Sequence, residues 1–138
     1  MQINRSSSAD TAAGPGEWFT GRVYVDTVAT PSESSRLGAA SVHFTPGART
    51  AWHTHPLGQT IYVTEGVGLC QRSDGPVEVI RPGDRVFFEP GEDHWHGTAP
   101  NRFMTHLAMQ QVDDHGSPVT WGEHVTDEEY GAAPSIER

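Results

Sequence analysis

Short runs rich in β-branched and aromatic residues alternate with turn signals along most of the chain. The turn signals combine Pro, Gly, Asp and Asn, and they recur at a spacing close to the ~8–12 residues typical of sheet sandwiches and barrels. They lie at residues 46–47, 56–58, 73–76, 81–84, 90–93 and 99–101. The runs that favour strands are residues 18–28, 39–44, 60–64, 77–80, 85–89 and 102–112. This pattern predicts an all-β fold without a long helix.

Both ends of the chain depart from this pattern. Residues 1–15 are mostly Ser, Ala, Gly and polar groups without periodicity, which indicates a flexible N-terminal arm. Near the other end, Thr126 and Glu129 have the spacing of a capping box, which predicts one or two helical turns. We therefore expect an arm over residues 1–15 and a single domain over residues 16–138 that ends in a short helical turn.

Composition and charge narrow the classes of function. A chain of 138 residues has the size of one domain, and its formal charge of −9 offers no basic stripe for nucleic acid. Cys70 is the only cysteine, so an internal disulfide is excluded and a reducing cytoplasm is expected. No run approaches the ~18 apolar residues of a membrane span, and residues 1–10 lack the apolar segment of a signal peptide. We expect a cytoplasmic protein without nucleic-acid or membrane partners.

Four side chains have the spacing of a metal site. On a strand, His53 and His55 face the same way, with attachment points ~6.6 Å apart, so both imidazoles can reach one ion. Gln59 follows across the tight turn at residues 56–58, and His94 comes from a distant strand after Pro90–Gly91. Closing a barrel would bring the two hairpins face to face. The metal could be zinc, iron, cobalt, nickel or manganese, since all of them tolerate such ligands.

The residues around this set resemble the two cupin motifs in the right order. The first motif is carried by Gly47, His53, His55, Gln59 and Gly66, and the second by Gly83, Asp84, Pro90, Gly91 and His94. The resemblance implies a cupin fold, the double-stranded β-helix or jelly-roll barrel. Two departures stand out: the second motif has one extra residue before Pro90 and lacks its final Asn, and Gln59 replaces the usual Glu.

The Gln59 replacement bears on the chemistry. A neutral amide leaves a divalent ion with its full charge, whereas a carboxylate would halve it, so the site should favour anionic ligands. Loss of the carboxylate also weakens the case for a trivalent ion and for iron-type oxygen chemistry. The substitution therefore favours Lewis-acid over redox catalysis.

A second ring of residues is expected beside the metal. His96 shares the face of His94, while His106 lies on a strand face with Met104, Ala108 and Gln110. Either histidine could exchange protons near neutral pH, or it could be a core residue satisfied by a carbonyl. Ala40 and Val42 share one strand face and would limit the width of a narrow barrel. Thr50 is either a substrate-orienting hydroxyl or an ordinary turn hydroxyl.

Nearly the whole chain is similar to the small bacterial cupins that include manganese-dependent hydroxynitrile lyases. The similarity is strongest over residues 46–60, 90–97 and 104–108. It implies manganese on His53, His55, Gln59 and His94, with His96 and His106 beside the substrate. It also implies that Ala40, Val42 and Gln110 shape the pocket. The implied activity is reversible cleavage of an (R)-cyanohydrin such as mandelonitrile to an aldehyde and hydrogen cyanide.

Two other functions compete with this interpretation. One is a metal-dependent dioxygenase or a decarboxylase that cleaves carbon–carbon bonds, since one fold hosts many activities. The other is a ligand-sensing cupin without turnover, although four retained ligands argue against a purely structural role. In each case the partner is a small molecule. The apolar face that carries Leu107 and Met109 suits pairing of outer strands, so a homodimer or homotetramer is expected.

Overall fold

The protein folds into two antiparallel sheets. The computed structural model describes residues 1–136. The first sheet has the order β1 (Ala12–Ala13), β3 (Val23–Ala29), β4 (Leu37–Phe44), β12 (Met104–Gln111), β7 (Gln59–Gly66) and β10 (Arg85–Phe88). The second has the order β13 (Thr120–Trp121), β6 (His53–Thr54), β11 (His94–Thr98), β5 (Arg49–Thr50) and β2 (Phe19–Thr20). In addition, β8 (Gly68–Arg72) pairs with β11, and β9 (Glu78–Ile80) pairs with β8. The all-β expectation is confirmed.

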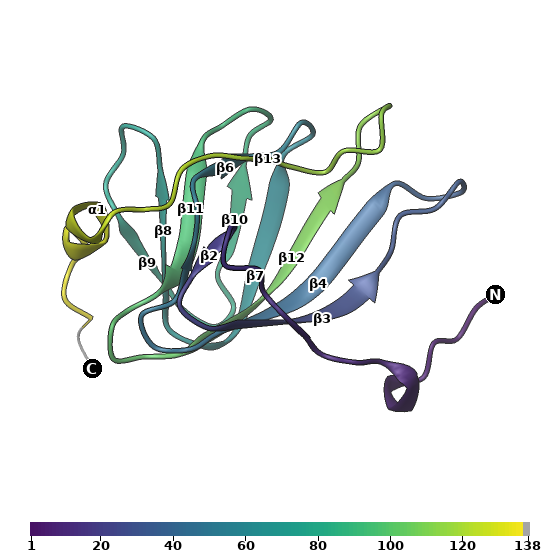
Figure 1. Ribbon diagram of the computed structural model, residues 1–138, viewed down its shortest axis with the longest axis horizontal. Helices are drawn as coiled ribbons and strands as arrows, with labels where there is room; N and C mark the ends of the chain where they lie inside the picture. Colours follow the sequence, from purple (N-terminus) through teal and green to yellow (C-terminus); the bar gives the residue numbers. More distant parts are fainter. Residues whose placement is uncertain (137–138) are drawn as a thin grey trace.

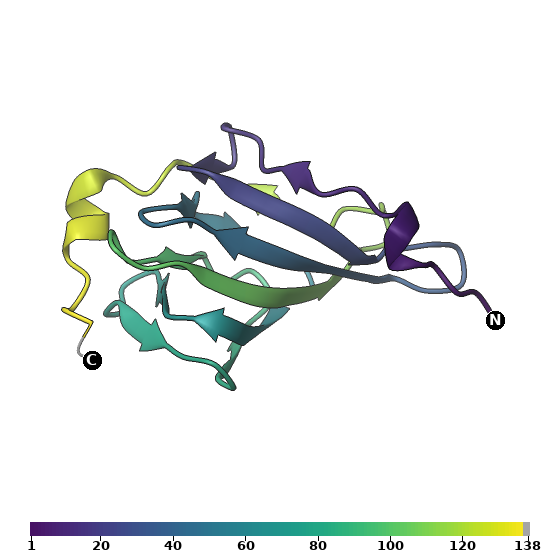
Figure 2. The ribbon, with the colours of Figure 1, turned by 90° about the horizontal axis from the view of Figure 1, so that it is seen from below.

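The expected strand over residues 18–28 is divided between the two sheets. Gly21 has φ of 81°, a left-handed conformation that favours glycine, and it separates β2 from β3. A Cβ atom here would lie 2.9 Å from the Cα atom of Ala48, so the close approach also requires glycine. β3 then runs beside β4, which pairs on its other edge with β12 (Figure 2).

A strand near the N-terminus and a helix near the C-terminus flank the body of the fold. Ala12 and Ala13 pair with Val25 and Tyr24, so the first sheet begins ahead of the expected boundary at residue 16. A short 3-10 turn, η1 (Ser6–Ser8), precedes this strand. The helix α1 (Asp127–Gly131) lies at the opposite end of the molecule from the N-terminus (Figure 1).

The helix has the capping box that the sequence predicts. The Thr126 hydroxyl accepts the Glu129 amide at 3.1 Å, and the Glu129 carboxylate accepts the Thr126 amide at 2.8 Å. Within residues 1–136, no helix has the length and apolar character that a membrane span needs.

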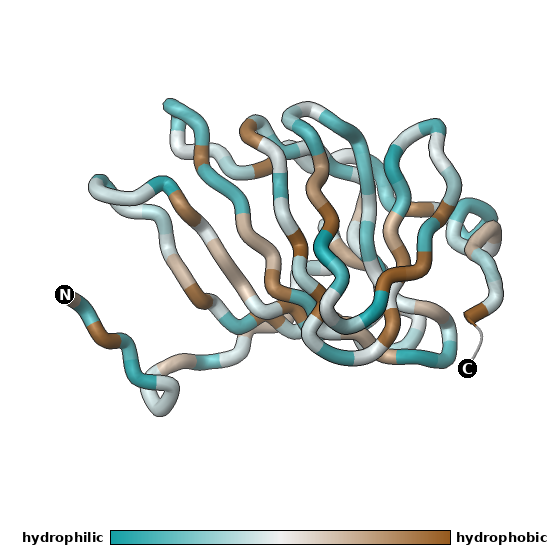
Figure 3. Tube along the Cα trace, turned by 180° about the vertical axis from the view of Figure 1, so that it is seen from behind, coloured by the Kyte–Doolittle hydropathy of each residue, from teal (hydrophilic) through white to brown (hydrophobic). Residues whose placement is uncertain are grey.

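Apolar side chains gather in two clusters. The cluster between the sheets includes Phe44, Ile61 and Met104, and the cluster under α1 includes Trp95 and Tyr130. Apolar and polar residues are interspersed along the strands (Figure 3), and successive side chains of a strand point to opposite faces. Because of this alternation, Trp95 packs into the second cluster while its neighbours on β11 point the other way. The histidines of β11 thus face the space between the sheets.

Candidate metal centre and pocket

Two short strands bring the histidines together. In the register of β6 and β11, His53 lies directly opposite His94, and His96 follows two residues along the same face. One ring nitrogen from each of these three residues lies within 4.8 Å of the other two, and all three side chains are buried. A buried group of three histidines at this spacing could hold a metal ion.

Three histidines are oriented by backbone carbonyl groups. His53 donates from Nδ1 to the Ala51 carbonyl at 2.8 Å, and His55 donates to the Pro118 carbonyl at 2.7 Å. His94 likewise donates from Nδ1 to the Glu92 carbonyl at 2.8 Å. With the proton on Nδ1, each Nε2 keeps a free lone pair, which is how metal-binding histidines are usually held.

Gln59 turns its carbonyl oxygen toward these lone pairs. Its Nε2 donates to Oε1 of Gln110 at 2.9 Å, which fixes the orientation of the amide. Its Oε1 then lies 3.3 Å from Nε2 of His94. Both of these atoms are acceptors, and Nε2 of His55 is also buried without a hydrogen-bond partner. A cation among these atoms would satisfy all of them, so the residues fit a metal ion.

The three histidines with converging ring nitrogens, His53, His94 and His96, are not the three histidines of the expected ligand set. His96 stands where His55 was expected, with its Nε2 atom 3.2 Å from Oε1 of Gln59. His55 is still near, because its ring centroid lies 5.0 Å from that of His53 and 5.5 Å from that of His94. His55 and His96 differ in what their Nδ1 atoms contact. Nδ1 of His55 donates to a backbone carbonyl group, whereas Nδ1 of His96 faces another histidine.

That other histidine is His106 on β12. Its Nε2 atom lies 2.8 Å from Nδ1 of His96, while its own Nδ1 is buried without a partner. If His96 donates from Nε2 to Gln59, its Nδ1 accepts the proton of His106, and the three side chains form one hydrogen-bonded chain. His96 and His106 are therefore coupled in a way that can relay a proton.

Burial keeps all five histidines neutral at pH 7. Desolvation is the largest cause in every case, and it lowers the pKa of His94 and of His106 to about 4. It holds the pKa of His53 and His96 well below 6.5, and it lowers that of His55. Neutral imidazoles are the form that binds metal and accepts protons.

A cavity of about 400 Å³ opens onto this group. Every expected pocket residue lines it, namely Ala40, Val42, Thr50 and Gln110, together with His53, His55, Gln59, His96 and His106. His94 is fully buried and does not line it. The Thr50 hydroxyl accepts the backbone amide of His96 at 3.2 Å, so it also holds β11 in place.

Sequence reasoning missed one wall of this cavity. Trp18, Phe19 and Trp121 line the cavity, although the sequence pattern gives none of them a role at the site. The N-terminal segment adds Ala12, Ala13 and Pro15, and the segment before β13 adds Pro118 and Val119. Aromatic residues on short strands most often serve burial, and no sequence signal places these distant segments together.

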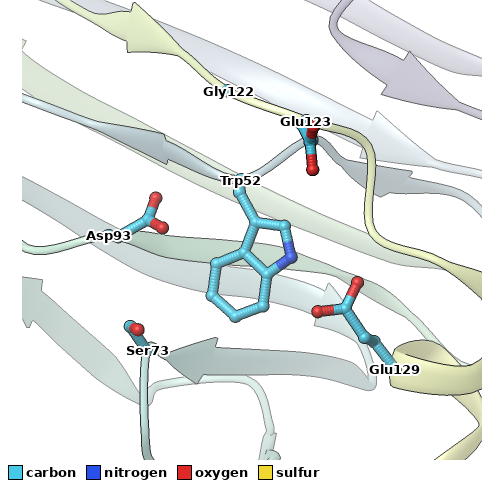
Figure 4. A pocket seen from close by; sticks show the side chains of 6 residues that line it. All are labelled: Trp52, Ser73, Asp93, Gly122, Glu123 and Glu129. Atoms are coloured by element: carbon cyan, nitrogen blue, oxygen red, sulfur yellow. The ribbon is translucent and has the colours of Figure 1, made fainter.

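A second pocket lies outside the histidine site. It has a volume of about 310 Å³, and Trp52 stands in it among the carboxylates of Asp93, Glu123 and Glu129 (Figure 4). None of its lining residues is a histidine or cysteine. Among the described residues, the convergent acceptors and the proton relay lie in the first cavity.

Comparison with known proteins agrees with the fold. The family model described as "Cupin domain" matches residues 40–106. A curated protein of Granulicella tundricola, named (R)-mandelonitrile lyase, is 55% identical over 130 residues, which cover 94% of this chain and 98% of the relative. A relative this similar, which is named as a lyase, supports the conclusion that this protein is an enzyme.

Solved structures share the fold. A cupin-like protein from Thermotoga maritima superposes with a TM-score of 0.84 at 36% identity, covering 91% of this chain and 95% of the other. A polyketide cyclase from Streptomyces resistomycificus superposes with a TM-score of 0.67 at 22% identity, covering 94% and 90%, and shares the fold alone. The chain therefore belongs to the cupin family, as a small bacterial cupin that resembles hydroxynitrile lyases.

Proposed function

We propose that this protein is a metal-dependent hydroxynitrile lyase that reversibly cleaves (R)-cyanohydrins such as mandelonitrile to an aldehyde and hydrogen cyanide. The name of the Granulicella tundricola relative supports this substrate, because the two chains match over nearly their whole lengths. The cavity supports it too, since both neutral histidines and apolar side chains line it.

The proposed ligands are His53, His55, Gln59 and His94, with manganese as the proposed ion. The three histidines are the ones whose Nδ1 atoms are held by carbonyl groups, which leaves His96 free for another role. A divalent ion bound there supplies Lewis acidity, which makes a nearby hydroxyl group more acidic.

The histidine pair handles the proton. Cleavage begins when the cyanohydrin hydroxyl gives its proton to the neutral pair of His96 and His106, whose low pKa values keep them unprotonated at pH 7. The carbonyl double bond forms as the bond between the carbinol carbon and the nitrile carbon breaks, and the bonding electrons leave with cyanide. The protonated pair then returns the proton to cyanide, which departs as hydrogen cyanide.

The observation that carries the proposal is the contact between His96 and His106 beside the convergent acceptors. A purely metal-storing or structural site does not need a second buried histidine pair facing its cavity. The test uses protein loaded with manganese and (R)-mandelonitrile. We expect benzaldehyde and hydrogen cyanide to appear in equal amounts. Full metal occupancy without cyanide release above the buffer rate contradicts the proposal.

We also propose that the enzyme works in the cytoplasm as a homodimer or homotetramer. The outer face of the first sheet supports this assembly, because Tyr62 lies opposite Leu107, and Thr60 lies opposite Met109, without a charged side chain in either pair. Sedimentation equilibrium tests the assembly. A monomer at micromolar concentration contradicts it.

A further inference from the structure

One wall of the cavity is aromatic and is formed by two segments that lie far apart in the sequence. Trp18 precedes β2, and Trp121 lies on β13, more than a hundred residues later. Their rings stack with centroids 5.3 Å apart and planes 8° from parallel. Phe19 packs at a tilt against Trp121, with centroids 6.0 Å apart. The three rings form a continuous apolar surface, which we call the aromatic wall.

This wall is fixed relative to the histidines. Trp121 pairs with His53 in the register of β13 and β6, and their ring centroids lie 4.7 Å apart. On the other side, the Trp18 carbonyl accepts the Ala51 amide at 2.8 Å, and Phe19 pairs with Thr50. The aromatic wall thus begins directly beside a proposed metal ligand. A ligand whose polar end lies among the histidines can therefore place its other end against the wall.

The N-terminal segment packs against the aromatic wall. The Gly14 amide donates to the Val23 carbonyl at 2.7 Å, next to the pairing of β1 with β3. A Cβ atom on Gly14 would lie 2.7 Å from a ring carbon of Phe19, so the backbone packs directly on that ring. Ala12, Ala13 and Pro15, from the segment that was expected to be a flexible arm, therefore line the pocket.

We propose that Trp18 and Trp121 determine specificity, so that the site prefers cyanohydrins with an aromatic substituent over small aliphatic ones. This inference rests on the proposed lyase function and deepens it. An aryl group against the stacked pair would bury apolar area and gain aromatic contacts, whereas a methyl group would leave the wall uncovered. Trp18 is the better residue to test, because Trp121 also contacts His53.

The test compares (R)-mandelonitrile with lactonitrile, the cyanohydrin of acetaldehyde. We expect Trp18→Ala to lower the ratio of their kcat/KM values about tenfold, equal to about 1.4 kcal/mol, mainly by raising the KM for mandelonitrile. Trp18→Phe should restore most of the ratio. The control is Phe87→Ala, an exposed aromatic outside the cavity, which should leave the ratio unchanged. Equal losses for both substrates in Trp18→Ala would overturn the proposal.

A binding measurement separates this inference from the lyase function. Benzyl alcohol has the ring and hydroxyl but no nitrile, so its affinity can be measured by calorimetry without turnover. We expect it to bind the wild-type protein about tenfold more tightly than Trp18→Ala. If this difference holds while cyanohydrins are not cleaved, the proposed function fails and the aromatic selection stands. Equal affinity, or no binding to the wild type, overturns the selection itself.

Discussion

The Nε2 atom of His106 lies 2.8 Å from Nδ1 of His96, although the two residues belong to strands of different sheets. Both side chains are almost fully buried, and both line the cavity. Their contact joins the two sheets at the place where the convergent histidine nitrogens and Gln59 meet.

The first prediction concerns the pH dependence of turnover. The pair accepts a proton only while neutral, and burial lowers the pKa of His106 from 6.5 to about 4. A lowered pKa extends the neutral form to lower pH, so kcat/KM should persist below pH 6.5 and decline only as the pH approaches about 4. Initial rates, with circular dichroism to verify folding at each pH, check this. An acid limb centred near 6.5 would contradict it.

The second prediction concerns the stability of the metal-free protein. Buried histidines take up protons more readily when unfolded, so stability should be constant above pH 6.5 and fall as the pH drops from 6.5 toward about 4. Each such histidine contributes up to about 1.4 kcal/mol per pH unit in this window. Urea unfolding at pH 7 and pH 5 measures the effect. An equal free energy of unfolding at both values would show that the histidines are not buried as described.

The third prediction concerns the amide that orients Gln59. Gln110→Leu removes the acceptor that holds the Gln59 side chain, so its carbonyl oxygen is no longer fixed toward the histidines. We expect manganese affinity to fall about tenfold, the lower end of what outer partners of metal ligands contribute. Competition with a chelator measures it. Gln111→Leu, at the exposed neighbouring position, is the matched control, and equal affinities in the two variants would exclude this role for Gln110.

The fourth prediction concerns the attachment of the C-terminal segment. The Arg49 guanidinium is buried, donates to the Val125 carbonyl at 3.0 Å and lies 4.2 Å over the Tyr130 ring. Lysine keeps the charge but loses the planar fork, so Arg49→Lys should cost about 2 kcal/mol of stability. Arg102→Lys, outside these contacts, should cost far less. A urea midpoint for Arg49→Lys that matches the wild type would contradict this.

Much of the fold followed from local patterns in the sequence. The runs that predict β4, β7 and β12 lie within or across the observed strands, and the capping box at Thr126 forms as expected. Alternation on β11 correctly placed His94 and His96 on one face and Trp95 on the other. The short strand β8 was missed, because it begins with Gly68 and contains no β-branched or aromatic residue.

The parts that could not be predicted depend on which distant segments meet. Alternation tells which face a residue occupies, but it does not tell that Trp18 stacks on Trp121 or that Ala12 pairs with Val25. The same holds for the contact of His106 with His96, which requires the two sheets to face each other at one register. Tertiary packing, rather than any local preference, decides these contacts.

The most direct test of the account measures metal content and cyanide release on the same sample of His96→Ala. In the proposed mechanism, His96 transfers a proton and His53 binds the metal. His96→Ala should therefore retain manganese and lose most of its activity on (R)-mandelonitrile, whereas His53→Ala, prepared in parallel, should lose both. Loss of manganese from His96→Ala to the same degree as from His53→Ala would contradict the account and make His96 a metal ligand.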